Sequence, residues 1–167
     1  GGRSWRRSAD GMTAVGRGCH EPTVVELRDG RLLCFLRTTN ACIHRSTSGD
    51  GSDHWTVPEP TDLIAPDSPP LLKRMPTGDL LLVWNRIASK KNMPRTPLTA
   101  AVSHDDGTTW QHVRHLEPRS DRDAAYASAL FHGDEALVAY YHRLHTWSRD
   151  TEVRLRIYAV DDFTGSL

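Results

Sequence analysis

Residues Ser103–Trp110 read SHDDGTTW and match the pattern S-x-D-x-G-x-T-W, the Asp box, at every fixed position. Ser48–Trp55, which reads SGDGSDHW, matches less well, because Ser52 replaces a glycine and His54 replaces a threonine. Gly1–Trp5, GGRSW, reads as the tail of a third box whose serine and aspartate are missing. The three tryptophans lie 50 and 55 residues apart. This period suits one four-stranded blade of a β-propeller.

A second repeat lies between the boxes and consists of an apolar run, a turn containing glycine and another apolar run. Its three copies are Pro22–Leu33, Pro70–Trp84 and Tyr126–Val138. Glycine supplies the positive φ that tight hairpin turns need, so each copy predicts a β-hairpin. Third strands are expected at residues 41–46, 98–103 and 153–160. No segment predicts a long amphipathic helix.

The two repeats together predict an all-β fold, a β-propeller of four-stranded antiparallel blades, of which this chain holds about three. The boxes are expected to be structural, with serine and aspartate bonding backbone groups in a turn and tryptophan packing between sheets. Calcium binding is disfavoured because the motif offers too few oxygens. The expected divisions are the end of a preceding blade at 1–20, blades at 21–60 and 66–118, and an incomplete blade at 122–167.

The composition excludes several classes of partner. Twenty-one basic residues balance 21 acidic ones, so no overall field attracts nucleic acid or an anionic membrane. No apolar run is long enough to span a bilayer, and Gly1–Trp5 has no apolar stretch like that of a secretory signal. Secreted, periplasmic and cytoplasmic locations all remain compatible. The three cysteines lack the spacing of a zinc site or disulfide scaffold, and Cys34 is expected in the core.

Two residues of the inner strands suggest a reaction. The innermost strands of a propeller and the loops at one end surround its axis, where chemistry is expected. Glu21 begins the first inner strand and Tyr126 begins the third, so both side chains are expected near the same central funnel. A tyrosine becomes a good nucleophile when a nearby base takes its proton, and Glu21 is the candidate base. The alternatives are a solvated Glu21 and an ordinary strand tyrosine, no different from Tyr140 or Tyr141.

Two arginines are candidates for binding an anion, because a guanidinium holds a carboxylate through two parallel hydrogen bonds and keeps its charge. Arg37 closes the second strand of the first blade, and Arg95 precedes the third strand of the next. Both also have a plainer interpretation as surface residues, since Arg86 occupies nearly the position of Arg37 one blade later and Arg95 lies among basic neighbours. The histidines show no metal-ligand spacing, and His142 and His145 are predicted at the surface.

Three stretches of the chain resemble sialidases (neuraminidases), the glycoside hydrolases built from BNR repeats. Glu21–Thr38 is similar to their segment with the activating glutamate and one arginine of a triad. Arg95–Trp110 is similar to the segment with another triad arginine, and Tyr126–Ser128 to the stretch with the tyrosine nucleophile. The resemblance spans nearly the whole chain. It implies a six-bladed propeller that releases terminal sialic acids with retention, without a metal or cofactor.

The resemblance also implies two parts that these residues do not contain. The first arginine of the triad and the aspartate general acid are both expected upstream of Gly1, so this fragment alone is expected to be inactive. The expected partner is a sialylated glycan or a related anionic sugar. Two other functions stay open: a noncatalytic Asp-box propeller that binds carbohydrate or protein, and a propeller enzyme that acts on another sugar.

Overall fold

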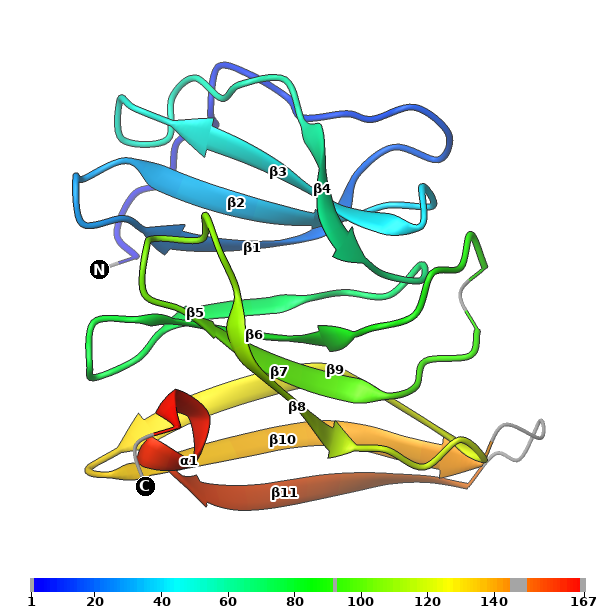
Figure 1. Ribbon diagram of the computed structural model, residues 1–167. Helices are drawn as coiled ribbons and strands as arrows, with labels where there is room; N and C mark the ends of the chain where they lie inside the picture. The colour runs from blue at the N-terminus through cyan, green and yellow to red at the C-terminus, as the bar shows by residue number, and fades with distance from the viewer. Residues whose placement is uncertain (1, 92, 145–149, 166–167) are drawn as a thin grey trace.

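In the computed structural model of the chain, which describes residues 2–91, 93–144 and 150–165, the strands form three antiparallel sheets (Figure 1). The first sheet contains, in spatial order, β1 (His20–Glu26), β2 (Leu32–Arg37), β3 (Cys42–Ser48) and β4 (Glu59–Ile64). The second contains β5 (Leu71–Arg74), β6 (Leu80–Asn85), β7 (Leu98–Ser103) and β8 (Gln111–Glu117). The third contains β9 (Arg122–His132), β10 (Glu135–Leu144) and β11 (Thr151–Ala159).

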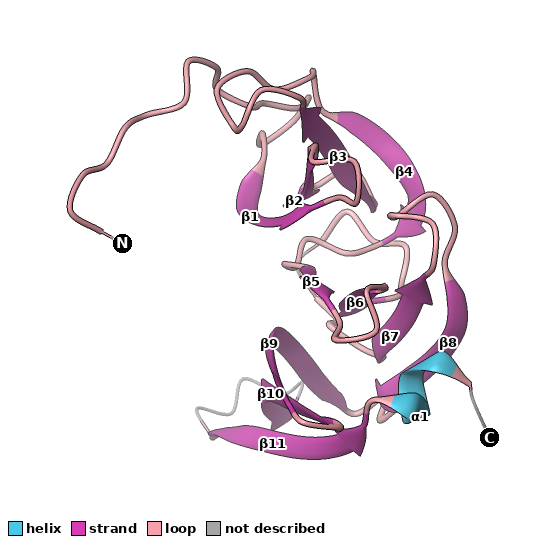
Figure 2. Cartoon of the chain, turned by 90° about the vertical axis from the view of Figure 1, so that its left-hand side faces the viewer, coloured by secondary structure: helices cyan, strands magenta, loops and turns pink. Residues whose placement is uncertain are grey.

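The three sheets are blades of a β-propeller, because each follows chain order from its inner to its outer strand. Figure 2 shows the blades side by side along an arc, with β1, β5 and β9 on the inner side. The predicted all-β fold is confirmed. Within the described ranges the only helix is the four-residue α1 (Asp161–Thr164), and no helix there is long and apolar enough to cross a membrane.

Apolar side chains between neighbouring blades form two cores, and β6 contributes to both. Leu82 and Trp84 belong to the core between the first and second blades, together with Phe35 of β2. Leu81 and Val83 belong to the core between the second and third blades. Successive residues of a strand point to opposite faces, and all six residues of β6 are buried. Burial on both faces explains why the first five residues of β6, LLLVW, are apolar without alternation.

The turn between β7 and β8 is closed by side chains of the complete Asp box. The Ser103 hydroxyl oxygen accepts a hydrogen bond from the Gly107 amide at 2.7 Å. Asp105 accepts bonds from the Thr109 amide at 2.8 Å and from its hydroxyl at 2.6 Å. Because these bonds satisfy backbone donors inside the turn, the two acceptor side chains stabilise its shape.

The corresponding turn between β3 and β4 has the same pattern of bonds despite its less regular sequence. Ser48 accepts from the Ser52 amide at 3.1 Å, and Asp50 accepts from the His54 amide at 3.0 Å. The His54 ring nitrogen lies 2.6 Å from Asp50 and takes the place of the threonine hydroxyl. A histidine can therefore substitute for the threonine of the pattern without loss of this turn.

The three tryptophans of the repeat differ in their packing. Trp110 packs against the core between the first and second blades, with its ring 6.0 Å from that of Phe35. Trp55 is partly buried, and its indole nitrogen donates to the Ser52 carbonyl oxygen at 3.2 Å. Trp5 is 91% exposed. Packing between sheets is therefore seen for Trp110 and not for Trp5.

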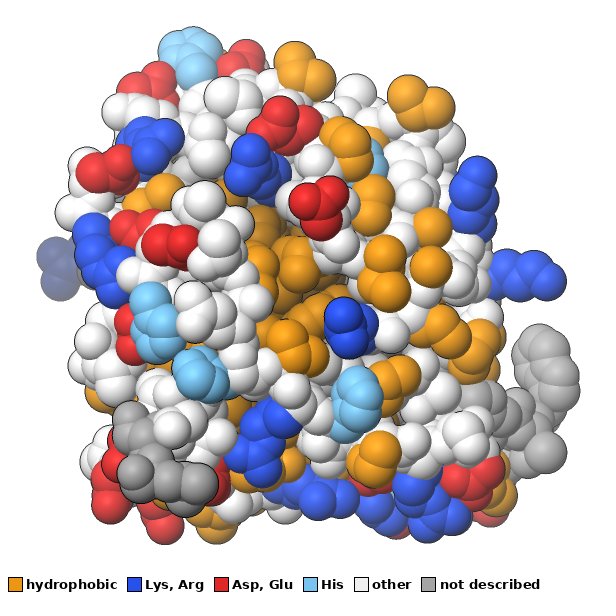
Figure 3. All heavy atoms as spheres, viewed as in Figure 1, with side chains coloured by type: hydrophobic (Ala, Val, Ile, Leu, Met, Phe, Trp, Pro, Cys, Tyr) orange, Lys and Arg blue, Asp and Glu red, His pale blue; other side chains and the backbone are white. Residues whose placement is uncertain are grey.

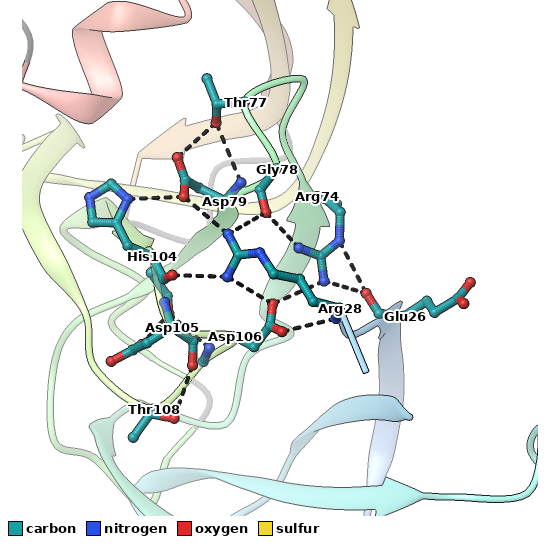
Figure 4. Close-up of polar contacts among 12 residues, drawn as sticks. Glu26, Arg28, Arg74, Thr77, Gly78, Asp79, His104, Asp105, Asp106 and Thr108 are labelled. Atoms are coloured by element: carbon teal, nitrogen blue, oxygen red, sulfur yellow. Dashed lines mark hydrogen bonds and ion pairs between the residues drawn. The ribbon is translucent and has the colours of Figure 1, made fainter. Parts of the chain in front are cut away.

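A polar network joins the first and second blades at the hairpin-turn end of the inner strands (Figure 4). Arg28, in the turn after β1, donates to the carbonyl oxygens of Gly78 and His104 at 2.9 Å each. Asp106 accepts from the Arg28 amide at 2.9 Å and from the Arg74 guanidinium at 3.1 Å. The turn network is defined here as Arg28, Arg74, Asp79, His104 and Asp106. Its bonds hold three turns from two blades together.

The prediction that His142 lies at the surface is wrong. Its side chain, on β10, is fully buried, with Nδ1 2.8 Å from Glu152 and Nε2 3.7 Å from Glu117. Glu117, at the end of β8, also pairs with two arginines of β11 at 3.1 and 3.2 Å. A buried carboxylate needs such partners, so this cluster stabilises the contact between the second and third blades. His145 lies outside the described residues.

Candidate active site

Glu21 and Tyr126 occupy equivalent β-bulges on the inner strands of the first and third blades. In β1, Glu21 and Pro22 lie opposite a single residue of β2, and in β9, Tyr126 and Ala127 lie opposite a single residue of β10. Glu21 has a φ of 45° and Tyr126 a φ of 56°, values that are uncommon for such residues and concentrate at functional sites. Each bulge re-aims a side chain. The strand β9 starts at Arg122, so Tyr126 lies inside it, and the prediction that Tyr126 begins the strand is wrong.

The side chains of Glu21, Arg37 and Tyr126 meet although they come from different blades. The Tyr126 hydroxyl donates to Glu21 Oε1 at 2.8 Å. Arg37 Nη1 donates to Glu21 Oε2 at 2.5 Å and to the Tyr126 hydroxyl at 3.3 Å. Burial acts to raise the pKa of Glu21, but hydrogen bonds from Arg37 and Tyr126 hold it below its ordinary value. Glu21 is therefore an ionised acceptor for the phenol proton at neutral pH.

A buried aspartate that the sequence analysis did not select holds Arg37 in place. Asp67 lies in the loop before β5, and its side chain is 4% exposed. Its Oδ1 accepts from Arg37 Nε at 2.6 Å and from Arg17 Nη2 at 2.8 Å. Burial acts to raise the pKa of Asp67, but the hydrogen bond and charge of Arg37 hold it low. Its one sequence signal, an aspartate in the proline-rich loop 66–70, is not specific.

Arg95 is buried beside the same cluster. Its Cζ lies 5.3 Å from the centroid of the Tyr126 ring, within the range of a cation–π contact. Nη1 donates to the Tyr141 hydroxyl at 3.2 Å, and Nη2 donates to the Asp67 carbonyl oxygen at 3.3 Å. Sequence reasoning treated Tyr141 as unremarkable, because its contact with Arg95 depends on a neighbouring blade.

Burial distinguishes the two selected arginines from Arg86, which occupies nearly the position of Arg37 one blade later. Arg37 and Arg95 are each 8% exposed, whereas Arg86 is exposed. Burial acts to lower the pKa of Arg37, but its hydrogen bonds to Asp67 and Glu21 raise it above the ordinary value. The axial cluster is defined here as Glu21, Arg37, Asp67, Arg95 and Tyr126.

A pocket of about 320 Å³ opens beside the axial cluster. It is lined by Met93, Arg95, Tyr126, Tyr141, Arg143 and Thr151. Two residues of the axial cluster, Arg95 and Tyr126, thus border a space that a ligand can enter. In the described part of the chain, no group of three or more His, Cys, Asp or Glu side chains could hold a metal ion.

A second groove, of about 390 Å³, lies between β4 and the β7–β8 turn. Figure 3 shows hydrophobic side chains gathered in a hollow at the centre of this face, and the groove is lined in part by Phe35, Leu63 and Trp110. Its ionisable lining residues are Arg45 and Asp62. Because these two residues do not form a pair of nucleophile and general base, this groove suits binding better than catalysis.

The blades form a β-propeller, and the axial cluster brings a tyrosine, a glutamate and two arginines together beside its inner strands. Residues 1–142 match the BNR repeat-like domain family. The chain belongs to this family, and the predicted resemblance to sialidase propellers is confirmed at the level of fold. No curated protein matches the chain significantly in sequence.

Solved structures with the same fold include two sialidases and an arabinanase. A mutant of the NanB sialidase from Streptococcus pneumoniae is 18% identical, with a TM-score of 0.75 over 96% of this chain and 26% of that one. The leech intramolecular trans-sialidase, complexed with 2,7-anhydro-Neu5Ac, is 19% identical, with a TM-score of 0.69 over 88% of this chain and 24% of that one. The Penicillium chrysogenum alpha-L-arabinanase, complexed with arabinobiose, is 18% identical, with a TM-score of 0.61 over 88% and 47%. The chain thus spans about a quarter of the length of the two sialidases.

Proposed function

We propose that the full-length protein containing this chain is a retaining, exo-sialidase-like glycoside hydrolase that releases terminal sialic acids from glycoconjugates. Tyr126 is the proposed nucleophile and Glu21 its base. The observation that carries the proposal is the 2.8 Å hydrogen bond from the Tyr126 hydroxyl to Glu21. Membership of the BNR repeat-like family and the fold shared with sialidases support it. The chain by itself is proposed to be inactive.

An anionic sugar suits the charge of the site. The guanidinium groups of Arg37 and Arg95 carry hydrogen-bond donors only and match the two oxygens of a carboxylate. Asp67 and Glu21 already hold the Arg37 guanidinium through bonds of 2.6 and 2.5 Å. Because this group is pre-oriented, it loses little conformational freedom when a substrate binds. A neutral phenol nucleophile also avoids the repulsion that a carboxylate nucleophile would meet from the sugar's own carboxylate.

The proposed reaction has two steps. First, Glu21 accepts the phenol proton of Tyr126 while the phenol oxygen attacks the anomeric carbon, and a general acid elsewhere in the full-length protein protonates the departing oxygen. Second, water gives a proton to the conjugate base of that acid and attacks the anomeric carbon, while Tyr126 leaves and regains its proton from Glu21. Two inversions give net retention. The charges of Arg37 and Arg95 stabilise the negative charge that develops on the phenol oxygen.

The test compares the full-length protein with its Tyr126→Phe variant in the release of a fluorogenic phenol from its α-sialoside. We expect kcat to fall by a factor of about 10³ or more, because the nucleophilic oxygen is lost. Tyr158→Phe is the matched control, since Tyr158 is a partly buried tyrosine of the same blade that does not line the pocket. Unchanged turnover in a folded Tyr126→Phe protein would refute the role of Tyr126.

If the folded full-length protein does not cleave sialosides, two other functions become the leading alternatives. The fold shared with an arabinanase supports an enzyme that acts on another sugar, which turnover of arabinosides would reveal. The groove with Phe35, Leu63 and Trp110 supports a noncatalytic module that binds carbohydrate or protein. Such a module would bind its ligand without turnover.

A further inference from the structure

Arg143 lines the pocket beside the axial cluster, and the proposed reaction gives it no role. Its side chain, on β10, is 37% exposed, and its Cζ lies 5.5 Å from the centroid of the Tyr141 ring. The Tyr141 ring lies 5.9 Å from the Tyr126 ring, which Arg95 covers. The pocket wall therefore contains a continuous row of contacting side chains, in the order Arg95, Tyr126, Tyr141 and Arg143.

A buried carboxylate contacts the backbone of one arginine of this row and the side chain of the other. Asp123 is fully buried, and its Oδ1 accepts from the Arg95 amide at 2.7 Å. Its Oδ2 lies 3.5 Å from Arg143 Nε. This ion pair and the bond from Arg143 Nη2 to the Met93 sulfur at 3.4 Å both favour a guanidinium placed at the pocket before a ligand arrives, which lowers the entropy lost on binding.

The far side of the pocket presents hydrogen-bond donors to a ligand. The guanidinium of Arg143 has donors only. The Tyr141 hydroxyl accepts from Arg95 at 3.2 Å. Burial raises the pKa of Tyr141, with Arg95 acting in the opposite sense, so the hydroxyl keeps its own proton to donate. A group that presents acceptor oxygens therefore complements these donors, and the volume of about 320 Å³ is within the usual range for ligand pockets.

We infer that Arg143 and Tyr141 form a second subsite of the substrate site, which binds an oxygen-rich group other than the carboxylate assigned to Arg37 and Arg95. The identity of the substrate rests on the proposed function. The acceptor oxygens belong either to the transferred sugar or to the leaving group. Arg143 sets affinity more than the chemical step, because its contacts are with Tyr141, Asp123 and the Met93 sulfur.

The test measures KM and kcat of the full-length protein and its Arg143→Gln variant with an aryl α-sialoside and with sialyllactose. We expect KM to rise about tenfold or more, since a charge-assisted hydrogen bond is lost, with kcat changed less than about twofold. A rise for both substrates assigns the subsite to the transferred sugar, and a rise for sialyllactose alone assigns it to the leaving group. An unchanged KM, or a fall in kcat alone, would overturn the inference.

Three further variants separate recognition from folding and from charge. Arg86→Gln removes the same charge from an exposed position and should leave KM unchanged. Arg143→Lys keeps the charge without the planar fork and should give an intermediate KM. Tyr141→Phe removes only a hydroxyl and should raise KM, which keeps the inference testable if Arg143→Gln does not fold.

The inference and the proposed function can fail separately. Turnover that does not depend on Tyr126 refutes the proposed nucleophile, whereas the KM ratio for Arg143→Gln reports on the subsite alone. Calorimetric binding of sialyllactose to the Tyr126→Phe protein, with and without Arg143→Gln, gives the corresponding ratio of Kd values without turnover. A protein that neither binds nor cleaves sialyllactose would overturn both.

Discussion

Two arginine–carboxylate networks join neighbouring blades at opposite ends of β1. The turn network begins at Arg28, two residues after the end of β1. The axial cluster includes Glu21, the second residue of β1. In the turn network, the side chains of Arg28 and Asp106 are 48% and 21% exposed. In the axial cluster, those of Arg37 and Asp67 are 9% and 4% exposed. The arginine–aspartate pair is thus partly solvated at one end of β1 and buried at the other.

The backbone differs between the two networks as well. Asp106 has a φ of 55° in a turn, where aspartate tolerates the left-handed region. Glu21 and Tyr126 adopt it inside strands, where a regular extended backbone was available. An inter-blade ion network therefore becomes a candidate for chemistry when burial, a constrained backbone and a nucleophile beside a base coincide. The turn network has the ions without the other features.

Among the variants that compare the two networks, the largest expected effect is that of removing the proposed base. Glu21→Gln keeps the size of the side chain and should lower kcat by a factor of about 10²–10⁴, because the phenol loses its proton acceptor. Glu26→Gln, at an exposed position of the same strand, should leave kcat unchanged. The assay is release of the fluorogenic phenol from its α-sialoside by the full-length protein. A kcat within a few-fold of the original would remove Glu21 from the mechanism.

The second expected effect is on stability. Asp67→Asn removes the buried one of the two carboxylates that pair with Arg37 and leaves Glu21 as its remaining charged partner. Breaking a buried pair costs up to about 3–5 kcal/mol. Asp79→Asn makes the same change in the turn network and should cost about 1 kcal/mol, as for partly exposed ion pairs. Denaturant unfolding of the two full-length variants gives both values. Equal losses would show that burial does not separate the two networks.

The third prediction concerns acid. The pKa of Asp67 is lowered in the folded protein, so the stability it contributes is complete above the ordinary aspartate value of about 3.9. That stability is lost as the pH falls through the lower folded value. The difference in unfolding free energy between the unsubstituted protein and Asp67→Asn should therefore be constant near neutral pH and shrink below about pH 4. A difference that grows in acid would reverse the assigned sign.

The smallest expected effect is that of Arg28→Gln in the turn network. The loss of its ion pairs should lower the free energy of unfolding by about 1 kcal/mol or less, and high salt should reduce the difference further. KM and kcat should not change, because Arg28 lies at the other end of β1. A loss of activity would show that the two ends of the blades are coupled.

The features that the sequence predicted are those set by local patterns. Hairpins and third strands follow from apolar runs, glycine turns and the Asp-box pattern, and the observed β7 has the bounds expected for it, residues 98–103. Asp67, Asp123 and Tyr141 were not selected, because each acquires its role from partners in other segments. Asp67, for example, contacts arginines 50 and 30 residues away in the chain.

The sequence by itself determined that this chain has a repeating all-β propeller fold and that Glu21 and Tyr126 belong to corresponding inner strands. Turn chemistry and apolar runs are encoded within a few neighbouring residues, which is why they can be read directly. Only the tertiary structure decided that Tyr126 bonds a glutamate 105 residues away, that Arg37 and Arg95 are buried while Arg86 is exposed, and that His142 is internal. Burial and pairing depend on how the blades pack against one another, and that packing brings together residues that are distant in the chain.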